Sequence, residues 1–270
     1  MTELPRTFET VNIHRRGGAA VIELNRPEAM NAWNYQFGVD LLAAVEQVAG
    51  DDDVRAVCIT GAGRGFSSGA DLKDMADRET TPEGHPDVYS TLTQRYHPII
   101  TGLRTMEKPV VAAVNGPAVG IGLSLALAAD LVVAKESAYF LLAFVNIGLV
   151  PDGGSSLFIP ARVGYARAAE MAMLGEPIPA PRALEWGLIN RVFDDGSFEE
   201  ESHALLERLA RGPTKSYAGT KRQLNRWLYA GMEEQLELEA RIQQEMAASR
   251  DFAEGVGAFV ERRAARFAGH

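Results

Sequence analysis

The chain has 270 residues, of which 46% are hydrophobic and 23% are charged. This composition is typical of a globular protein that is long enough to bury a large core in one or two domains. The formal net charge of −9 argues against nucleic acid or an anionic membrane as the main partner.

The N-terminal end and the cysteine content give an expectation about location. The first ten residues, MTELPRTFET, contain no apolar stretch of the kind found in a secretory signal. The single cysteine, Cys58, lies in the apolar stretch AVCIT, so a buried thiol is expected and an intrachain disulfide is excluded. The most apolar run, residues 121–134, is too short to cross a bilayer. We therefore expect a cytoplasmic protein without a membrane segment.

Strands and helices alternate in the first half of the chain. Apolar stretches predict strands at residues 8–14, 19–24, 54–60 and 109–114. Between the second and third of these, apolar residues recur at helical spacing and predict one face of a helix: Phe37, Leu41, Leu42, Val45 and Val48. A polar insertion, DRETTPEGHPD, precedes a second helix that is expected from about residue 91 to residue 106.

The second half of the chain changes character. After the strand at 109–114, glycines open an apolar helix, and strand character resumes at residues 131–134 and 138–142. From residue 166 onward the pattern is helical. Strands interleaved with helices, followed by helices alone, predict an α/β core at residues 1–200 and a C-terminal helical region at residues 201–270.

Two glycine-rich loops each follow a strand and precede a helix: GRGFSSGADL at residues 63–72, and NGPAVGIGL at residues 115–123. Glycine lets the backbone turn sharply, and free N–H groups near a helix start favour a negative oxygen. The two loops could together form an oxyanion hole, in which one donor is typically worth about 3–4 kcal/mol. From spacing alone, each loop could equally be a tight connection between a strand and a helix, without a binding role. Neither has the spacing of a dinucleotide site.

A lone acid, Asp152, lies in the apolar stretch NIGLVPDGGSSLFIP, with no other acid within seven residues on either side. Local sequence leaves two interpretations open. Asp152 is either a turn residue or cap of the following helix, or a carboxylate whose apolar neighbours let it exchange protons near neutral pH.

Seven stretches occur in an order that resembles the crotonase superfamily, which includes enoyl-CoA hydratases and isomerases. They cover the chain from about Phe8 to Phe267: LNRPEAMNAW, GRGFSSGADLKDM, KPVVAAVNGPAVGIGL, AADLVVAKESAYF, IGLVPDGGSS, ALEWGLINRV and EGVGAFVERR. The resemblance implies an α/β spiral of ββα units with a C-terminal helical trimerisation region, assembled as a homotrimer or a dimer of trimers. It also implies an acyl-CoA thioester substrate and no cofactor, because coenzyme A is carried by the substrate.

Matched by position, the resemblance assigns the oxyanion hole to the N–H groups of Ala70 and Ile121. Family members usually carry glycine or alanine at the second position, so the branched side chain of Ile121 is expected to narrow the acyl pocket. Contacts to CoA carry over, mainly through backbone groups, to the following residues: Arg26, Ser68, Ala70, Asp71, Leu72, Lys73 and Ile121.

Hydratases of this family use two glutamates, and this chain has Ser124 and Phe144 at their positions. Without the general base and the acid, efficient hydration is not expected. The stretch around Asp152 resembles instead the ring-epoxyphenylacetyl-CoA isomerases and the Δ3-Δ2-enoyl-CoA isomerases, which work through a single aspartate. The resemblance thus implies an enzyme that shifts a double bond of an enoyl-CoA, with Asp152, Ala70 and Ile121 as catalytic residues.

Three other functions stay open. One is an enoyl-CoA hydratase of weak activity. Another is an aryl-CoA dehalogenase or hydrolase that uses Asp152 as a nucleophile, because such enzymes have an aromatic near Phe144 and a histidine near His97. The third is an acyl-CoA-binding or RNA-binding relative without turnover, although the basic stretch TKRQLNR is short and is offset by MEEQLELE. No cluster of His, Cys and acids has metal-ligand spacing, so no metal is expected.

Overall fold

The computed structural model describes residues 8–72 and 79–270. In this part of the chain the main sheet has six strands in the order β1-β2-β3-β4-β6-β9. The first two strands form an antiparallel hairpin, and each later neighbour is added in parallel. The strands are β1 (Val11–Arg16), β2 (Ala19–Leu24), β3 (Ala56–Gly61), β4 (Val110–Val114), β6 (Leu131–Lys135) and β9 (Arg191–Phe193).

Both faces of this sheet are covered, which explains why its central strands are continuously apolar. Val57 and Ile59 of β3 face the main core, whereas Ala56 and Cys58 face a second cluster formed with helix α7 (Phe198–Arg211). A parallel strand that is buried on both faces needs apolar residues on both sides of the pleat. The expected burial of Cys58 is confirmed, and burial raises the pKa of its thiol to about 12.

A second, smaller sheet joins β5 (Ala118–Val119), β7 (Tyr139–Leu141) and β8 (Ile178–Pro179). Strand pairs alternate between the two sheets and are followed by a helix. β4 and β5 precede α4 (Ile121–Ala128), and β6 and β7 precede α5 (Ser155–Leu174). These are the ββα units that the resemblance implies, and the predicted α/β fold class is confirmed.

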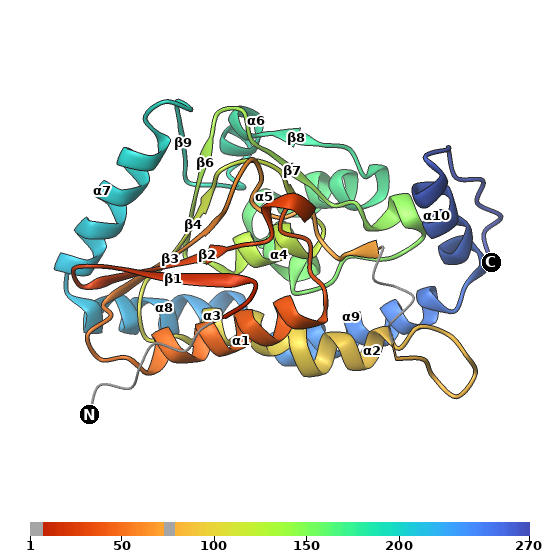
Figure 1. Ribbon diagram of the computed structural model, residues 1–270, viewed down its shortest axis with the longest axis horizontal. Helices are drawn as coiled ribbons and strands as arrows, with labels where there is room; N and C mark the ends of the chain where they lie inside the picture. Colours follow the sequence, from red (N-terminus) through yellow and green to blue (C-terminus); the bar gives the residue numbers. More distant parts are fainter. Residues whose placement is uncertain (1–7, 73–78) are drawn as a thin grey trace.

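Helices cover the ends and one side of the sheets (Figure 1). Helix α7 lies at one end of the molecule and α10 (Arg250–Glu261) lies at the other, next to the C-terminus, whereas α9 (Met232–Ala247) runs along the bottom of the view towards α10. The other helices of the described residues are η1 (Pro27–Ala29), α1 (Tyr35–Gly50), α2 (Val88–Thr91), η3 (Leu92–Tyr96), α3 (His97–Thr105), η4 (Phe144–Ile147), α6 (Ala180–Glu185) and α8 (Thr214–Leu228).

Two helices differ from the prediction. The helix expected at residues 91–106 is divided into α2, a π-helical turn η3 and α3, with Pro98 in the first turn of α3. Helix α5 begins at Ser155, eleven residues before the helical pattern in the sequence becomes clear. Pro160 and Gly164, which has a φ of +76°, interrupt its periodicity.

Candidate active site

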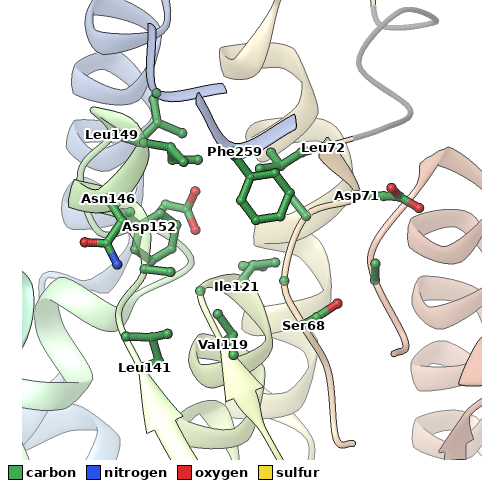
Figure 2. Close-up of a pocket in the computed structure, with 18 of the residues that line it drawn as sticks. Ser68, Asp71, Leu72, Val119, Ile121, Leu141, Asn146, Leu149, Asp152 and Phe259 are labelled. Carbon is green, nitrogen blue, oxygen red and sulfur yellow. The ribbon is translucent and has the colours of Figure 1, made fainter. Parts of the chain in front are cut away.

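A cavity of about 630 Å³ lies where the first glycine loop, the start of α4, η4 and the C-terminal helices α9 and α10 meet. Its wall includes Ala70, Ile121 and Asp152, so the structure brings the three predicted catalytic residues to one site. Figure 2 shows the Asp152 carboxylate facing the space bounded by Ile121, Leu149 and Phe259.

The first loop presents the Ala70 N–H towards the cavity. Trp33 donates its N–H to the Gly69 carbonyl at 2.8 Å and accepts one from Asp71 at 3.0 Å, which fixes the backbone on either side of Ala70. In such a parallel bridge the intervening N–H points the other way. Gly69 has a φ of +90°, and a Cβ at this position would lie 2.9 Å from the Val119 carbonyl oxygen. Glycine is therefore needed both for the conformation and for the close approach of the two loops.

The second predicted donor, the N–H of Ile121, is the first N–H of α4. Gly120 has a φ of +54° and donates its own N–H to the Leu141 carbonyl at 2.9 Å. A Cβ on Gly120 would lie 4.0 Å from the Gly69 Cα, so the two glycine loops meet here. The first N–H groups of a helix have no acceptor within the helix. Among the described hydrogen bonds, neither Ala70 nor Ile121 donates its N–H to a backbone carbonyl. Both are thus available to a substrate oxygen.

At the C-terminal end of α4, arginine side chains donate hydrogen bonds to the carbonyl groups of the helix. Arg104 donates to the Ala128 carbonyl at 3.1 Å, and Arg162 donates to the Leu127 carbonyl at 2.8 Å. Positive charge at a helix C-terminus complements the helix dipole, whose positive end lies at Ile121. All eight residues of α4 are buried, so the helix is fixed along its whole length.

Asp152 is 5% exposed and is held through its main chain as well as its side chain. Its carbonyl oxygen accepts hydrogen bonds from the hydroxyls of Ser124 and Ser155, both at 2.7 Å. Its carboxylate Oδ2 accepts a hydrogen bond at 2.7 Å from the side-chain amide of Gln243 on α9. The next residue, Gly153, has a φ of +60° and packs against the side chain of Ile121 so closely that a Cβ would collide with it. The residue that follows Asp152 therefore contacts Ile121, the second predicted oxyanion donor.

The two positions at which the resemblance expects hydratase glutamates hold no carboxylate in the structure. Ser124 is buried and turns its hydroxyl to the Asp152 carbonyl. Phe144 is 7% exposed and lines the cavity, where it adds apolar surface beside Gly120. Of the described residues that line the cavity, three are acids: Glu28, Asp71 and Asp152. Asp71 lies across the cavity and is turned away from Asp152 (Figure 2).

The residues predicted to contact CoA fall into three groups. Ser68, Asp71 and Leu72 line the cavity together with Ala70 and Ile121. Arg26 is not among the described lining residues. Its guanidinium forms an ion pair with Asp71 at 3.0 Å and donates to the Ala32 carbonyl, so it joins two loops behind the cavity wall. Lys73 lies outside the described residues.

His97 does not line the cavity in the described part of the chain, although its neighbour Tyr96 does. Its side chain is buried, and desolvation lowers the pKa of His97 to about 4. The imidazole is therefore neutral at pH 7. This placement argues against a dehalogenase in which His97 assists a nucleophilic Asp152.

Sequence reasoning missed two residues of α9. Gln243 lines the cavity and bonds Asp152, and Glu239, one turn earlier, accepts N–H groups from Gly154 at 2.8 Å and Ser156 at 3.2 Å. Both are buried, although the stretch MEEQLELEARIQQ reads as a charged surface helix. A signal was present, because Glu239 and Gln243 share the spacing of the buried Leu236, Ala240 and Ala247.

Across residues 8–72 and 79–270, none of the helices combines the length and apolar character needed to span a bilayer. The same part of the chain has no group of three or more His, Cys, Asp and Glu side chains arranged to hold a metal ion.

Comparisons with known proteins give the class of this site. The family model for enoyl-CoA hydratase/isomerase matches residues 14–270. The chain belongs to this family, and the predicted crotonase fold is confirmed.

The chain is similar over nearly its whole length to individual proteins of this family. The chain is 42% identical to a probable enoyl-CoA hydratase of Rhodobacter capsulatus, over 97% of this chain and 99% of the relative. It is 38% identical to the 1,2-epoxyphenylacetyl-CoA isomerase of Escherichia coli, over 97% and 99%. A crystal structure of an enoyl-CoA hydratase from Mycobacterium avium subsp. paratuberculosis is 36% identical, with a TM-score of 0.87 over 97% of this chain and 100% of that one.

Proposed function

We propose that this enzyme moves the double bond of an enoyl-CoA from the 3- to the 2-position, with Asp152 as its acid and base. One observation carries the proposal: a buried carboxylate faces the cavity beside the Ala70 and Ile121 amides, while Ser124 and Phe144 occupy the two hydratase glutamate positions. The 38% identity to the 1,2-epoxyphenylacetyl-CoA isomerase of Escherichia coli supports an isomerase rather than a hydratase.

The chemistry needs one proton carrier. The Asp152 carboxylate takes a proton from C2 of the 3-enoyl thioester, and the electron pair moves onto the thioester oxygen to give a dienolate. The Ala70 and Ile121 N–H groups stabilise this oxyanion, an effect worth about 3–4 kcal/mol for each donor. Protonated Asp152 then returns the proton at C4, and the double bond settles between C2 and C3. CoA enters and leaves as part of the substrate, so the reaction needs no other cofactor.

Hydration is the second candidate, because the relative with 42% identity is described as a probable hydratase. Syn addition of water needs a group to hold the water and a group to protonate the α-carbon. Asp152 alone would have to serve both purposes, and we expect this side reaction to be slow.

Label incorporation separates the candidates. The enzyme is incubated with 3-enoyl-CoA and 2-enoyl-CoA series in deuterated buffer, and products are followed by mass spectrometry and NMR. Deuterium at C2 and C4 supports the isomerase, whereas a 3-hydroxyacyl product supports the hydratase. The absence of exchange and of product with every acyl group contradicts both and favours a binding role.

We also propose that the protein acts as a homotrimer or a dimer of trimers, with residues 201–270 contributing to assembly. Large apolar side chains are exposed on α5 and α8 of the isolated chain: Tyr165, Met173, Leu224 and Trp227, the last of these 85% exposed. Large apolar side chains that are exposed on an isolated chain favour burial in an interface. Light scattering coupled to gel filtration tests this, and a monomer at micromolar concentration contradicts it.

A further inference from the structure

The C-terminal helix α9 contacts the acid of the site through the side chain of one residue. We propose that Gln243 is a positioning residue for Asp152, which orients the carboxylate for proton transfer at both carbons of the substrate. The proposal rests on the proposed function, because it assumes that Asp152 carries the proton. If so, catalysis depends on a residue that lies 91 positions after Asp152 in the chain.

Both the nitrogen and the oxygen of the Gln243 side-chain amide form hydrogen bonds. Its Nε2 donates to Asp152 Oδ2 at 2.7 Å, and its Oε1 accepts the Val150 N–H at 3.2 Å. The side chain is 1% exposed, so water does not compete for these bonds. One amide therefore fixes the carboxylate and, at the same time, the backbone two residues before it.

Further contacts restrict the main chain at Asp152. Ser124 and Ser155 both donate to its carbonyl oxygen, and Gly153 packs directly against Ile121. With the backbone held in this way, the remaining freedom of Asp152 is rotation about its side-chain bonds. The hydrogen bond from Gln243 selects one orientation of the carboxylate plane.

Glu239 holds the other side of the same loop. It lies one helical turn before Gln243 on α9, and it accepts the N–H groups of Gly154 and Ser156. Helix α9 thus binds the backbone before Asp152 through Gln243 and the backbone after Asp152 through Glu239. Because both contacts come from one rigid helix, the position of Asp152 relative to the amide donors depends on where α9 lies.

The chemistry explains why orientation is needed. One carboxylate has to reach C2 and then C4 of a substrate whose thioester oxygen is fixed by the Ala70 and Ile121 amides. A displacement of about 1 Å in such a group can lower the rate about 100-fold, because proton transfer requires close approach. Loss of Gln243 should therefore lower kcat and leave binding of the CoA portion largely intact.

The test compares two variants of Gln243 with a matched control. Gln243→Met keeps the length of the side chain and removes both hydrogen bonds, whereas Gln243→Glu keeps the acceptor for Val150 and puts a second carboxyl group against Asp152. Gln244→Met is the control, because Gln244 is the next residue on α9 and accepts the Val88 and Tyr89 N–H groups at 2.9 and 3.0 Å, away from Asp152.

We expect both Gln243 variants to lower kcat about 10- to 100-fold with KM changed less than about 3-fold. Gln244→Met should lose similar thermal stability and keep kcat. The acidic limb of the pH–rate profile should move to higher pH in Gln243→Met, because a hydrogen bond to a carboxylate stabilises its ionised form. It should move further in Gln243→Glu, since a second carboxylate next to Asp152 disfavours ionisation.

Asp152→Asn and the double variant Asp152→Asn/Gln243→Met separate the two proposals. If Asp152→Asn keeps most of its activity, the proposed function fails. If Asp152→Asn is inactive but Gln243→Met and Gln243→Glu keep kcat and an unshifted profile, Gln243 is not a positioning residue. Equal losses of kcat in Gln243→Met and Gln244→Met would also overturn the inference. If the inference is correct, Gln243→Met causes no further loss of activity in the Asp152→Asn background.

Discussion

The two sides of the cavity are built from different parts of the chain. In the proposed mechanism, the side that binds the substrate oxygen consists of backbone N–H groups, which two glycine loops at residues 63–72 and 115–123 bring together. The side proposed to face the substrate carbons is the side chain of Asp152, a residue held by Ser124, Ser155 and Gln243. The first side depends on the backbone conformation of a few glycines and on the close approach of their two loops, whereas the second depends on the identity of side chains that form hydrogen bonds.

This difference has a physical consequence for how each side tolerates change. Any residue other than proline supplies an N–H, so the donors at Ala70 and Ile121 survive most substitutions there. What they require is glycine at Gly69 and Gly120. The acid has the opposite requirement, because its own identity and the identity of its hydrogen-bond partners determine whether a proton can be transferred.

The largest effect should come from removing the proton carrier. Asp152→Asn keeps the size of the side chain but leaves no base, and kcat for double-bond migration should fall about 10³- to 10⁴-fold. Binding of an unreactive acyl-CoA, measured by calorimetry, should stay within a few-fold of the unsubstituted enzyme. A variant that keeps most of its turnover would remove Asp152 from the mechanism.

The second largest effect should come from displacing the backbone N–H groups of the two glycine loops. Gly69→Ala places a Cβ 2.9 Å from the Val119 carbonyl oxygen at a φ of +90°, which should displace the Ala70 N–H and lower kcat about 10²- to 10³-fold. Gly84→Ala is the matched control, because Gly84 has a similar φ of +85° with no atom within 4 Å of its Cβ position. Equal kinetic losses in the two variants would show that backbone strain, rather than loop contact, is responsible.

A third prediction concerns stability around the acid. Burial raises the pKa of Glu239 from 4.5 to about 7, against hydrogen bonds from Ser156 and Gly154 that lower it. A carboxyl with a raised pKa binds its proton more tightly when folded, so its contribution to stability is complete below about pH 4.5 and is lost as the pH rises to about 7. The difference between the two pKa values corresponds to about 3 kcal/mol.

Urea unfolding of the unsubstituted protein and of Glu239→Gln from about pH 5 to about pH 8 measures this effect. The free energy of unfolding of the unsubstituted protein, minus that of the variant, should decrease as the pH rises. Other groups, including His97, titrate alike in both proteins and cancel in the difference. A difference that stays constant with pH would show that Glu239 is not protonated in the folded state.

The smallest effect should follow a change of side chain at a donor position. Ile121→Val keeps the N–H and removes one buried methylene, so we expect about 1 kcal/mol lower stability and kcat within about 2-fold. If Ile121 narrows the acyl pocket, the variant should show a lower KM for the bulkier acyl groups in a substrate series. A large fall in kcat would mean that the side chain of Ile121, and not only its amide, contributes to the rate.

The difference between the two sides of the cavity also explains how much of the site could be predicted from the sequence. Gly69, Gly120 and Asp152 lie in short stretches whose glycines and isolated acid can be recognised locally, and β2 and the apolar face of α1 follow from periodicity. Gln243 and Glu239 could not be assigned, because their polar side chains resemble the solvated positions around them. Their role depends on packing of α9 against a loop about 90 residues earlier, which one sequence does not encode locally.

The dependence of Asp152 on α9 also affects how such a protein can be recombined with its relatives. A chimera joined between α8 and α9 would inherit the acid, the serines and both glycine loops from one parent, and the amide partner from the other. Such a chimera should fold and bind its thioester, yet turn over slowly unless the incoming helix carries an amide at the position of Gln243. Exchange points placed before α4, which keep Ser124, Asp152 and Gln243 in one inherited block, should preserve activity more often.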